Sequence, residues 1–136
     1  MKKAVSLKFS ELQEKVEIEL DVSQSPKTVR AIIGSLPIKV TIHRWGDELY
    51  TDETPVKVEE EDAKSVVSLL DAAYWPEGSA LCFFYGQTPL SKQGKILPYS
   101  PVNIIGRITT VPLNAEKFLA SVEELHVNKK VPVVLS

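Results

Sequence analysis

The alternation of hydrophobic and polar positions predicts that most of the chain forms β-strands. Residues 4–9 and 16–22 alternate apolar side chains with charged or hydroxyl ones, the pattern of a strand with one buried face. The polar link at 10–15 is short, so these two strands are expected to pair as an antiparallel hairpin. Further strands are predicted at 38–45, 48–51, 102–111 and 131–135, with a strand end at 56–58. Gly106, inside one of these strands, indicates a β-bulge or a close approach of two backbones.

The densest aromatic stretch, residues 74–89, predicts the central hairpin of the fold. Two extended arms at 71–75 and 80–86 flank a turn that contains proline and glycine. The second arm carries a continuous apolar run at 81–84, which is too short for a helix and indicates a strand buried on both faces or lying in a barrel wall. The first arm ends in two large amphipathic rings, which suit a position between apolar protein and water.

Two helices are predicted, one toward each end of the chain. Ser25 and Pro26 fit the N-cap and the first position of a helix whose apolar residues recur at helical spacing. Pro37 ends this helix. A second helix is expected over 115–125. Residues 65–70 fit a helical turn and a strand about equally well.

The order of these elements predicts a mainly β fold in a single domain over residues 1–136. About eight strands outnumber two helices, and the helices do not alternate with the strands, which argues against a doubly wound parallel sheet. We therefore predict a closed β-barrel of about eight strands capped by the two helices. Closure removes the exposed sheet edges that such apolar strands would otherwise offer for aggregation.

Charge and composition narrow the classes of partner. The net charge of −2 leaves no basic field, so nucleic acids and anionic membranes are not expected as partners. No apolar run reaches the length of a membrane span, and the N-terminal residues lack the apolar stretch of a signal peptide. A cytoplasmic protein is therefore expected. The single cysteine excludes an internal disulfide.

The residue types that usually carry catalysis or bind metals are sparse. Cys82 lies within the apolar run of the central hairpin, where a buried and unreactive thiol is expected. His43 and His126 are the two histidines, and no Cys/His spacing predicts a metal site. The glycines are scattered and form no phosphate-binding loop, so neither a metal nor a cofactor is predicted. The acidic run at 59–62 is expected to be a solvated loop or a helix start.

Arg44 is the most informative charged residue. If Ile38, Val40 and Ile42 point into the barrel, Arg44 continues their face to the barrel mouth, where it needs a carboxylate or a ligand oxygen as partner. The aromatic residues around it would then form an apolar pocket with a few polar groups, which is typical of a small-molecule or peptide site. The candidate ligand-binding residues are Trp45, Tyr74, Trp75, Phe83, Tyr85 and Asn103.

Several segments resemble a known family. The tripeptides PKT at 26–28 and IHR at 42–44 are similar to a strand-to-helix junction and an arginine-bearing strand of cyclophilins. The chain is closer to a small cyclophilin-like family of uncharacterised archaeal and bacterial proteins. The shared patterns are WGDE at 45–48, YWPxGxALCxFxGxTP at 74–89 and PVNxxGxI at 101–108.

This resemblance implies a closed eight-stranded barrel with capping helices and leaves the function open. Prolyl isomerases of the fold hold proline against aromatic rings and use an arginine, which Arg44 matches. Their pocket phenylalanine, loop tryptophan and late histidine fall on Cys82, on Leu90 and near Val102. One hypothesis is a non-enzymatic module that binds a peptide or small molecule. The others are a prolyl isomerase with an altered site and an enzyme of another class on the same barrel.

Overall fold

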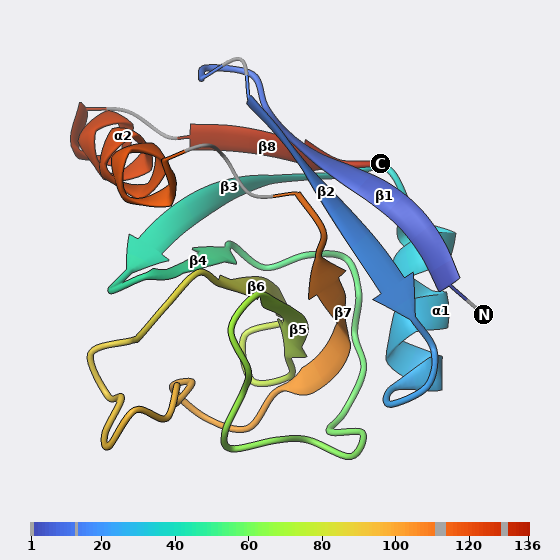
Figure 1. The fold of residues 1–136 in the computed structure, drawn as a ribbon. Coiled ribbons are helices and arrows are strands. Elements are labelled where there is room, and N and C mark those ends of the chain that lie inside the picture. Colours follow the sequence, from blue (N-terminus) through green and yellow to red (C-terminus); the bar gives the residue numbers. More distant parts are fainter. Residues whose placement is uncertain (1, 13, 111–113, 129–130) are drawn as a thin grey trace.

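The eight described strands close into an antiparallel barrel, which confirms the predicted fold class. The computed structural model describes residues 2–12, 14–110, 114–128 and 131–136. Around the barrel the strands follow the order β1-β2-β7-β5-β6-β4-β3-β8, and β8 pairs with β1 to complete the ring (Figure 1). The strands are β1 Lys2–Phe9, β2 Glu14–Asp21, β3 Ile38–Trp45, β4 Glu48–Thr51, β5 Asp71–Trp75, β6 Ala80–Phe84, β7 Asn103–Ile108 and β8 Val131–Leu135.

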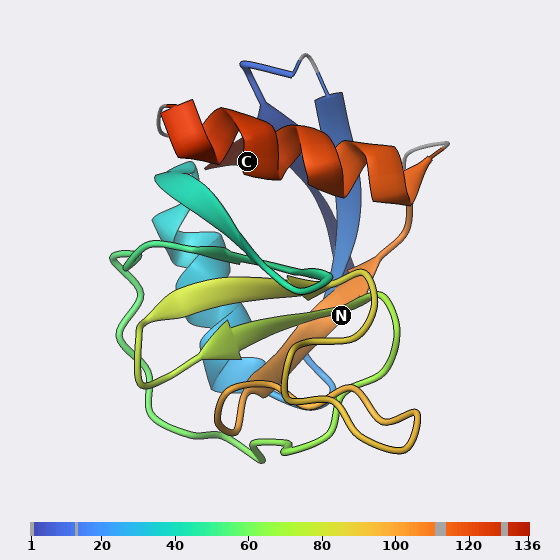
Figure 2. The same cartoon turned by 90° about the vertical axis from the view of Figure 1, so that its left-hand side faces the viewer.

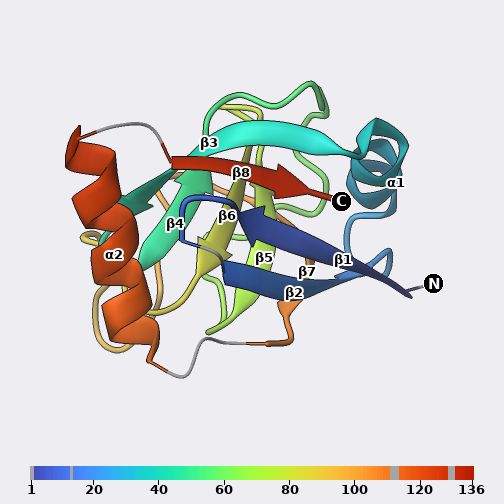
Figure 3. The ribbon, with the colours of Figure 1, turned by 90° about the horizontal axis from the view of Figure 1, so that it is seen from above.

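The two helices of the described chain lie at opposite ends of the barrel. Helix α1, Pro26–Ser35, contacts β2 and β7, whereas α2, Ala115–Asn128, contacts β3 and β8. Seen from above, the barrel lies between them (Figure 3). The predicted pair of capping helices is therefore confirmed.

The inside of the barrel is filled with side chains. Alternate residues of the strands point inward, as Val5, Leu7 and Phe9 do in β1, and are at most 2% exposed. Helix α2 closes one end by placing the ring of Phe118 edge-on to that of Phe9, with 5.1 Å between ring centroids. The described interior is therefore packed core, as in small barrels whose inward-facing side chains fill the space.

Two long connections, residues 52–70 and 85–102, cover part of the outer wall. Figure 2 shows them gathered on the side of the barrel away from α2. They contain no regular strand, so the strand end expected at 56–58 is absent, and 65–70 contributes an isolated bridge between Val67 and Ile96. The strand predicted at 102–111 is shorter, Asn103–Ile108, and Val111 lies outside the described residues. A second apolar cluster fills the space beneath these connections: Val67, Ala73, Cys82, Phe84, Ile96, Val102 and Ile104.

The start of α1 is capped by a residue far away in the sequence. Ser25 occupies the N-cap position as predicted, but its side chain makes no capping hydrogen bond to the helix. The Glu61 carboxylate instead accepts hydrogen bonds from the backbone N–H groups of Lys27 and Thr28, at 3.0 and 2.9 Å, and from the Thr28 hydroxyl at 2.8 Å. The acidic run at 59–62 therefore supplies a helix cap as well as solvated charge.

Replacing Glu61 by alanine is expected to lower the free energy of unfolding by about 1–2 kcal/mol, the usual cost of losing a cap. Desolvation opposes ionisation of Glu61, but the N–H donors of Lys27 and Thr28 outweigh it and lower its pKa below the ordinary 4.5. The stabilisation by the Glu61 cap should therefore be fully present above about pH 4.5 and disappear as the pH falls through the lowered pKa. Urea unfolding at pH 7 and pH 3 measures it. Glu60→Ala, an exposed position in the same run, is the charge-matched control.

Candidate functional site

A pocket of about 310 Å³ lies on the outer face of the barrel wall, where β4, β6 and β5 meet the connection 85–102. It is at the small end of ligand pockets, which span roughly 300–1,000 Å³. Its lining is predominantly apolar and aromatic, with one carboxyl group. The lining residues are Trp45, Glu48, Tyr50, Trp75, Cys82, Pro98, Tyr99 and Val102.

Strand alternation explains which side chains reach the pocket. Successive residues of a strand point to opposite faces, so Glu48 and Tyr50 of β4 face outward while Leu49 between them is buried in the barrel. In the same way Cys82 of β6 faces the pocket and Phe83 faces the barrel interior. One wall of the barrel thus serves as core on one side and as the pocket floor on the other.

Three aromatic rings form the walls. Tyr99 lies between the two tryptophans, edge-on to Trp45 with centroids 6.1 Å apart and edge-on to Trp75 with centroids 5.8 Å apart. The ring of Trp75 lies directly against Gly78, so closely that a Cβ atom at this glycine would overlap it. Its indole N–H donates to the Ser100 hydroxyl. The Trp75 ring is therefore held in place by its neighbours, whereas Tyr99 is 68% exposed.

Glu48 is the polar group of the floor. The residue is 5% exposed, and its Oε1 has no hydrogen-bond partner among the described residues. Its cross-strand neighbours are Trp45 on β3 and Phe84 on β6, neither of which offers charge. Desolvation raises the pKa of Glu48 from 4.5 to about 7, opposed by a hydrogen bond with the Cys82 thiol. An apolar pocket thus contains an acid that titrates near neutral pH.

Cys82 does not have the properties of a reactive thiol. It is 3% exposed, and burial, together with the nearby Glu48, raises the pKa of its thiol well above the ordinary value. The thiolate required of a nucleophile is therefore disfavoured. Within the described ranges, no group of three His, Cys, Asp or Glu side chains is placed to hold a metal ion. The helices of these ranges are also too short or too polar to cross a membrane.

Arg44 is not among the pocket-lining residues and is bound by three protein groups. Its Nε donates to the Gly46 carbonyl oxygen at 2.7 Å, and its two terminal nitrogens bind the carboxylates of Asp47 and Glu123, each at 3.1 Å. The partner of this arginine is thus carboxylate, one of the two alternatives that the sequence left open. It joins the end of β3 to α2 at the barrel end, on the opposite side of the strand from Trp45.

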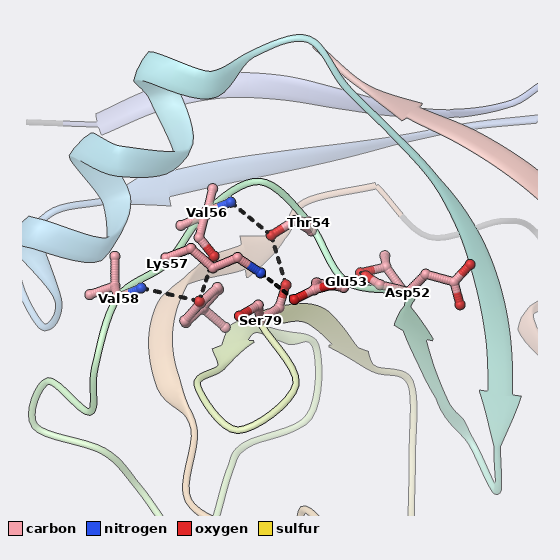
Figure 4. A network of polar contacts seen from close by, with 9 residues as sticks. Asp52, Glu53, Thr54, Val56, Lys57, Val58 and Ser79 are labelled. Carbon is pink, nitrogen blue, oxygen red and sulfur yellow. Dashed lines mark hydrogen bonds and ion pairs between the residues drawn. The ribbon is translucent and has the colours of Figure 1, made fainter.

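Tyr74 is placed in the barrel interior, with no exposed surface. Its hydroxyl donates to the Val56 carbonyl oxygen at 2.7 Å and accepts from the Val58 N–H at 3.3 Å. Figure 4 shows Val56 and Val58 beside Thr54, whose hydroxyl donates to the Ser79 carbonyl oxygen at 2.7 Å. Tyr74 therefore anchors the connection after β4 to the barrel.

The remaining candidates also contact protein groups away from the pocket. Phe83 is 1% exposed in the barrel core, and Tyr85 packs its ring on Phe118, where desolvation raises the pKa of its phenol. The Asn103 amide is buried and donates to Thr28 Oγ1 and accepts from the Glu61 N–H. Of the predicted set, the structure brings Trp45 and Trp75 together in the pocket.

The structure adds Glu48, Tyr50 and Tyr99 to the two predicted tryptophans. Sequence reasoning did not select them. One signal was available for Glu48, because Gly46–Asp47 is a two-residue turn that places it directly opposite Trp45. Tyr99 lies in an irregular connection, and nothing local to it indicates where its ring lies.

Comparison with known proteins gives consistent matches in sequence and in fold. The family model described as cyclophilin-like matches residues 3–128. The solution structure of the hypothetical protein AF2241 from Archaeoglobus fulgidus has 42% identity and a TM-score of 0.74, over 98% of this chain and 92% of that one. McbB in complex with tryptophan has 14% identity and a TM-score of 0.71, over 96% of this chain and 43% of that one. No curated protein matches the chain.

Proposed function

The chain belongs to the cyclophilin-like family, and from this premise we propose that it binds a small organic molecule or a peptide side chain in the outer-wall pocket. The observation that supports this is the pocket itself, a hollow of about 310 Å³ walled by Trp45, Trp75 and Tyr99 over a buried carboxyl group. Concave, mostly apolar sites with a few polar groups are the usual form of ligand sites.

The pocket is suited to a compact ligand with an apolar body. Two tryptophan rings and a tyrosine ring offer a large apolar contact area, and the hydrogen bond to Ser100 already orients one of them, Trp75. Little conformational freedom is therefore lost on binding. The tryptophan bound by McbB, whose fold is shared, is one reasonable ligand to include in a screen.

Prolyl isomerisation is the second candidate, and one observation favours it. Cys82 and Val102 line the pocket, and these are the positions aligned at or near the pocket phenylalanine and late histidine of the isomerases that the sequence resembles. Arg44, however, is bound to Asp47 and Glu123. A protease-coupled assay on proline peptides tests this candidate. If the protein isomerises these peptides and Arg44→Ala abolishes the activity, the protein is a prolyl isomerase and the proposal of a binding module is wrong.

Tryptophan fluorescence tests the binding proposal directly, because the two tryptophans of the sequence are both in the pocket lining. Small amines, amino acids and short peptides should change the emission on titration. Trp75→Ala should weaken the binding of any hit by tenfold or more, about 1.4 kcal/mol, because it removes a wall. Leu69→Ala, an exposed apolar residue outside the lining, should leave affinity unchanged. Equal affinity in the Trp75 variant would place the ligand elsewhere.

A further inference from the structure

We propose that the pocket selects ligands that carry a protonated amine on a small apolar body, with Glu48 as the countercharge and the surrounding rings as the cage. This inference rests on the proposed binding function and names the chemical class of the ligand. Three features of the described residues support it: an unpartnered carboxyl oxygen, an aromatic wall, and the lack of a basic side chain in the lining.

One oxygen of the Glu48 carboxyl group lacks a partner within the described part of the chain. Glu48 is 5% exposed, and its Oε1 accepts no hydrogen bond within the described part of the chain. A buried polar group without a partner costs free energy, and an ionised one costs far more. A neutral donor would satisfy the oxygen, but a cation would also neutralise the charge. An ammonium group therefore gains more at this position than an amide or a hydroxyl.

The walls suit the rest of such a ligand. Trp45, Trp75 and Tyr99 line the same hollow as Glu48, and Tyr50 follows Glu48 on the outer face of β4. Aromatic faces attract cations, tryptophan most strongly, and cages of such rings recognise ammonium groups. The same rings accept the apolar carbons attached to the nitrogen. Carboxylate and rings together favour an amine over a neutral molecule of the same shape.

Among the described residues that line the pocket there is neither lysine nor arginine, so none of them competes for this carboxylate. Arg44, the cation nearest in sequence, is turned to the other face of β3 and bound to Asp47 and Glu123. The pocket therefore has an acid without an internal counterion. It differs in this from the surface carboxylates, such as Glu53, which pairs with Lys57.

Ionisation of Glu48 gives the proposed selectivity a pH dependence. The titratable groups around it are Cys82 on β6, Tyr50 on its own strand and the phenol of Tyr99 in the connection. The pKa values of the Cys82 thiol and of Tyr50 are raised, chiefly by burial, so both stay neutral near pH 7. Glu48, with its pKa of about 7, changes from mostly neutral at pH 6 to mostly ionised at pH 8. Ammonium affinity should rise about tenfold over this interval.

The test compares benzylamine with benzyl alcohol, which has nearly the same shape without the charge. Binding is followed by the indole N–H signals of Trp45 and Trp75 in nitrogen-15 NMR spectra at pH 6 and pH 8. At pH 8 the amine should bind at least tenfold more tightly than the alcohol. That preference should shrink at pH 6, and in Glu48→Gln it should fall to the part that the aromatic rings alone supply. Glu53→Gln, which removes an exposed carboxylate outside the lining, should retain it.

The outcomes separate this inference from the function on which it rests. Equal binding of amine and alcohol at pH 8 leaves a ligand pocket in place and overturns the ammonium selectivity. An undiminished preference in a folded Glu48→Gln protein overturns it as well. Binding of neither probe, with no response to any amine or apolar compound in the wider screen, rejects the pocket itself. If Glu48→Gln does not fold, the pH profile of the wild-type protein decides, since a flat profile excludes Glu48 as the countercharge.

Discussion

Gly106→Ala is expected to destabilise the barrel by about 3 kcal/mol or more, at the upper end of the cost of overpacking. A Cβ atom at this position would overlap the carbonyl oxygen of Glu19 on β2 and would lie 2.9 Å from its carbonyl carbon and 3.0 Å from the Cα of Leu20. All three are backbone atoms of a paired strand, so relief requires β2 and β7 to separate. Urea unfolding with constant m-value measures the loss.

Gly34→Ala is the matched control for this substitution. It makes the same chemical change at an exposed position of α1, where a Cβ atom would meet nothing within 4 Å and the backbone is helical. It should stabilise the protein by about 0.5–1 kcal/mol, because alanine is the better helix former. If both variants shifted the urea midpoint equally, the proposed backbone clash at β2 would not be the cause.

The position of Gly106 illustrates how far the fold could be predicted from the sequence. A glycine inside a strand pattern predicted a bulge or a close approach, and both occur: β5 shifts register against β7 between Ala72 and Ala73, and Glu19 approaches the glycine. The eight described strands and two helices likewise follow from local signals, namely periodicity, turn residues and the apolar run at 81–84. Local signals suffice here because each element has one face in a common core.

The candidate site was harder to predict because neighbouring strand residues were assigned to one pocket. Arg44 with Trp45 and Tyr74 with Trp75 are adjacent pairs, and adjacent residues of a strand face opposite sides. Sorting them by parity separates Trp45 and Trp75, which line the pocket, from Arg44 and Tyr74, which do not. The information was present in the alternation that predicted the strands. The alternation alone did not indicate which face of each strand lies on the outside of the barrel.

The burial of Glu48 depends on residues that are far from it in the sequence. The sequence of the strand around it, with Leu49 and Tyr50, does not predict that the carboxyl group is buried, since alternating strands usually expose their polar residues. Pro98 and Tyr99 of the connection 85–102 line the same pocket as Glu48, which is 5% exposed. The local pattern therefore predicts the strand correctly and the solvation of its acid incorrectly. Such local conflicts are expected at functional sites.

Glu48→Gln is expected to stabilise the ligand-free protein at pH 8 by about 2–3 kcal/mol. The pKa of Glu48 is raised in the folded protein from 4.5 to about 7, so the folded state holds its proton over a range in which the unfolded chain has lost it. Stability of the wild type therefore falls as the pH rises between these values. At about 1.4 kcal/mol per pKa unit the full penalty is about 3 kcal/mol. Glutamine has the same shape and cannot ionise, so the penalty is absent.

Urea unfolding of both proteins at pH 5 and pH 8 measures this difference, and Glu53→Gln corrects for the loss of one carboxylate elsewhere. At pH 5 the stabilisation by Glu48→Gln should be at most about 1 kcal/mol, because Glu48 is already neutral in the folded wild type. A gain independent of pH would mean that Glu48 is not desolvated in solution. A saturating amine should reduce the gain at pH 8, because a bound cation compensates the same charge in the wild type. Glu48 would then be the residue that destabilises the ligand-free protein and also binds the ligand.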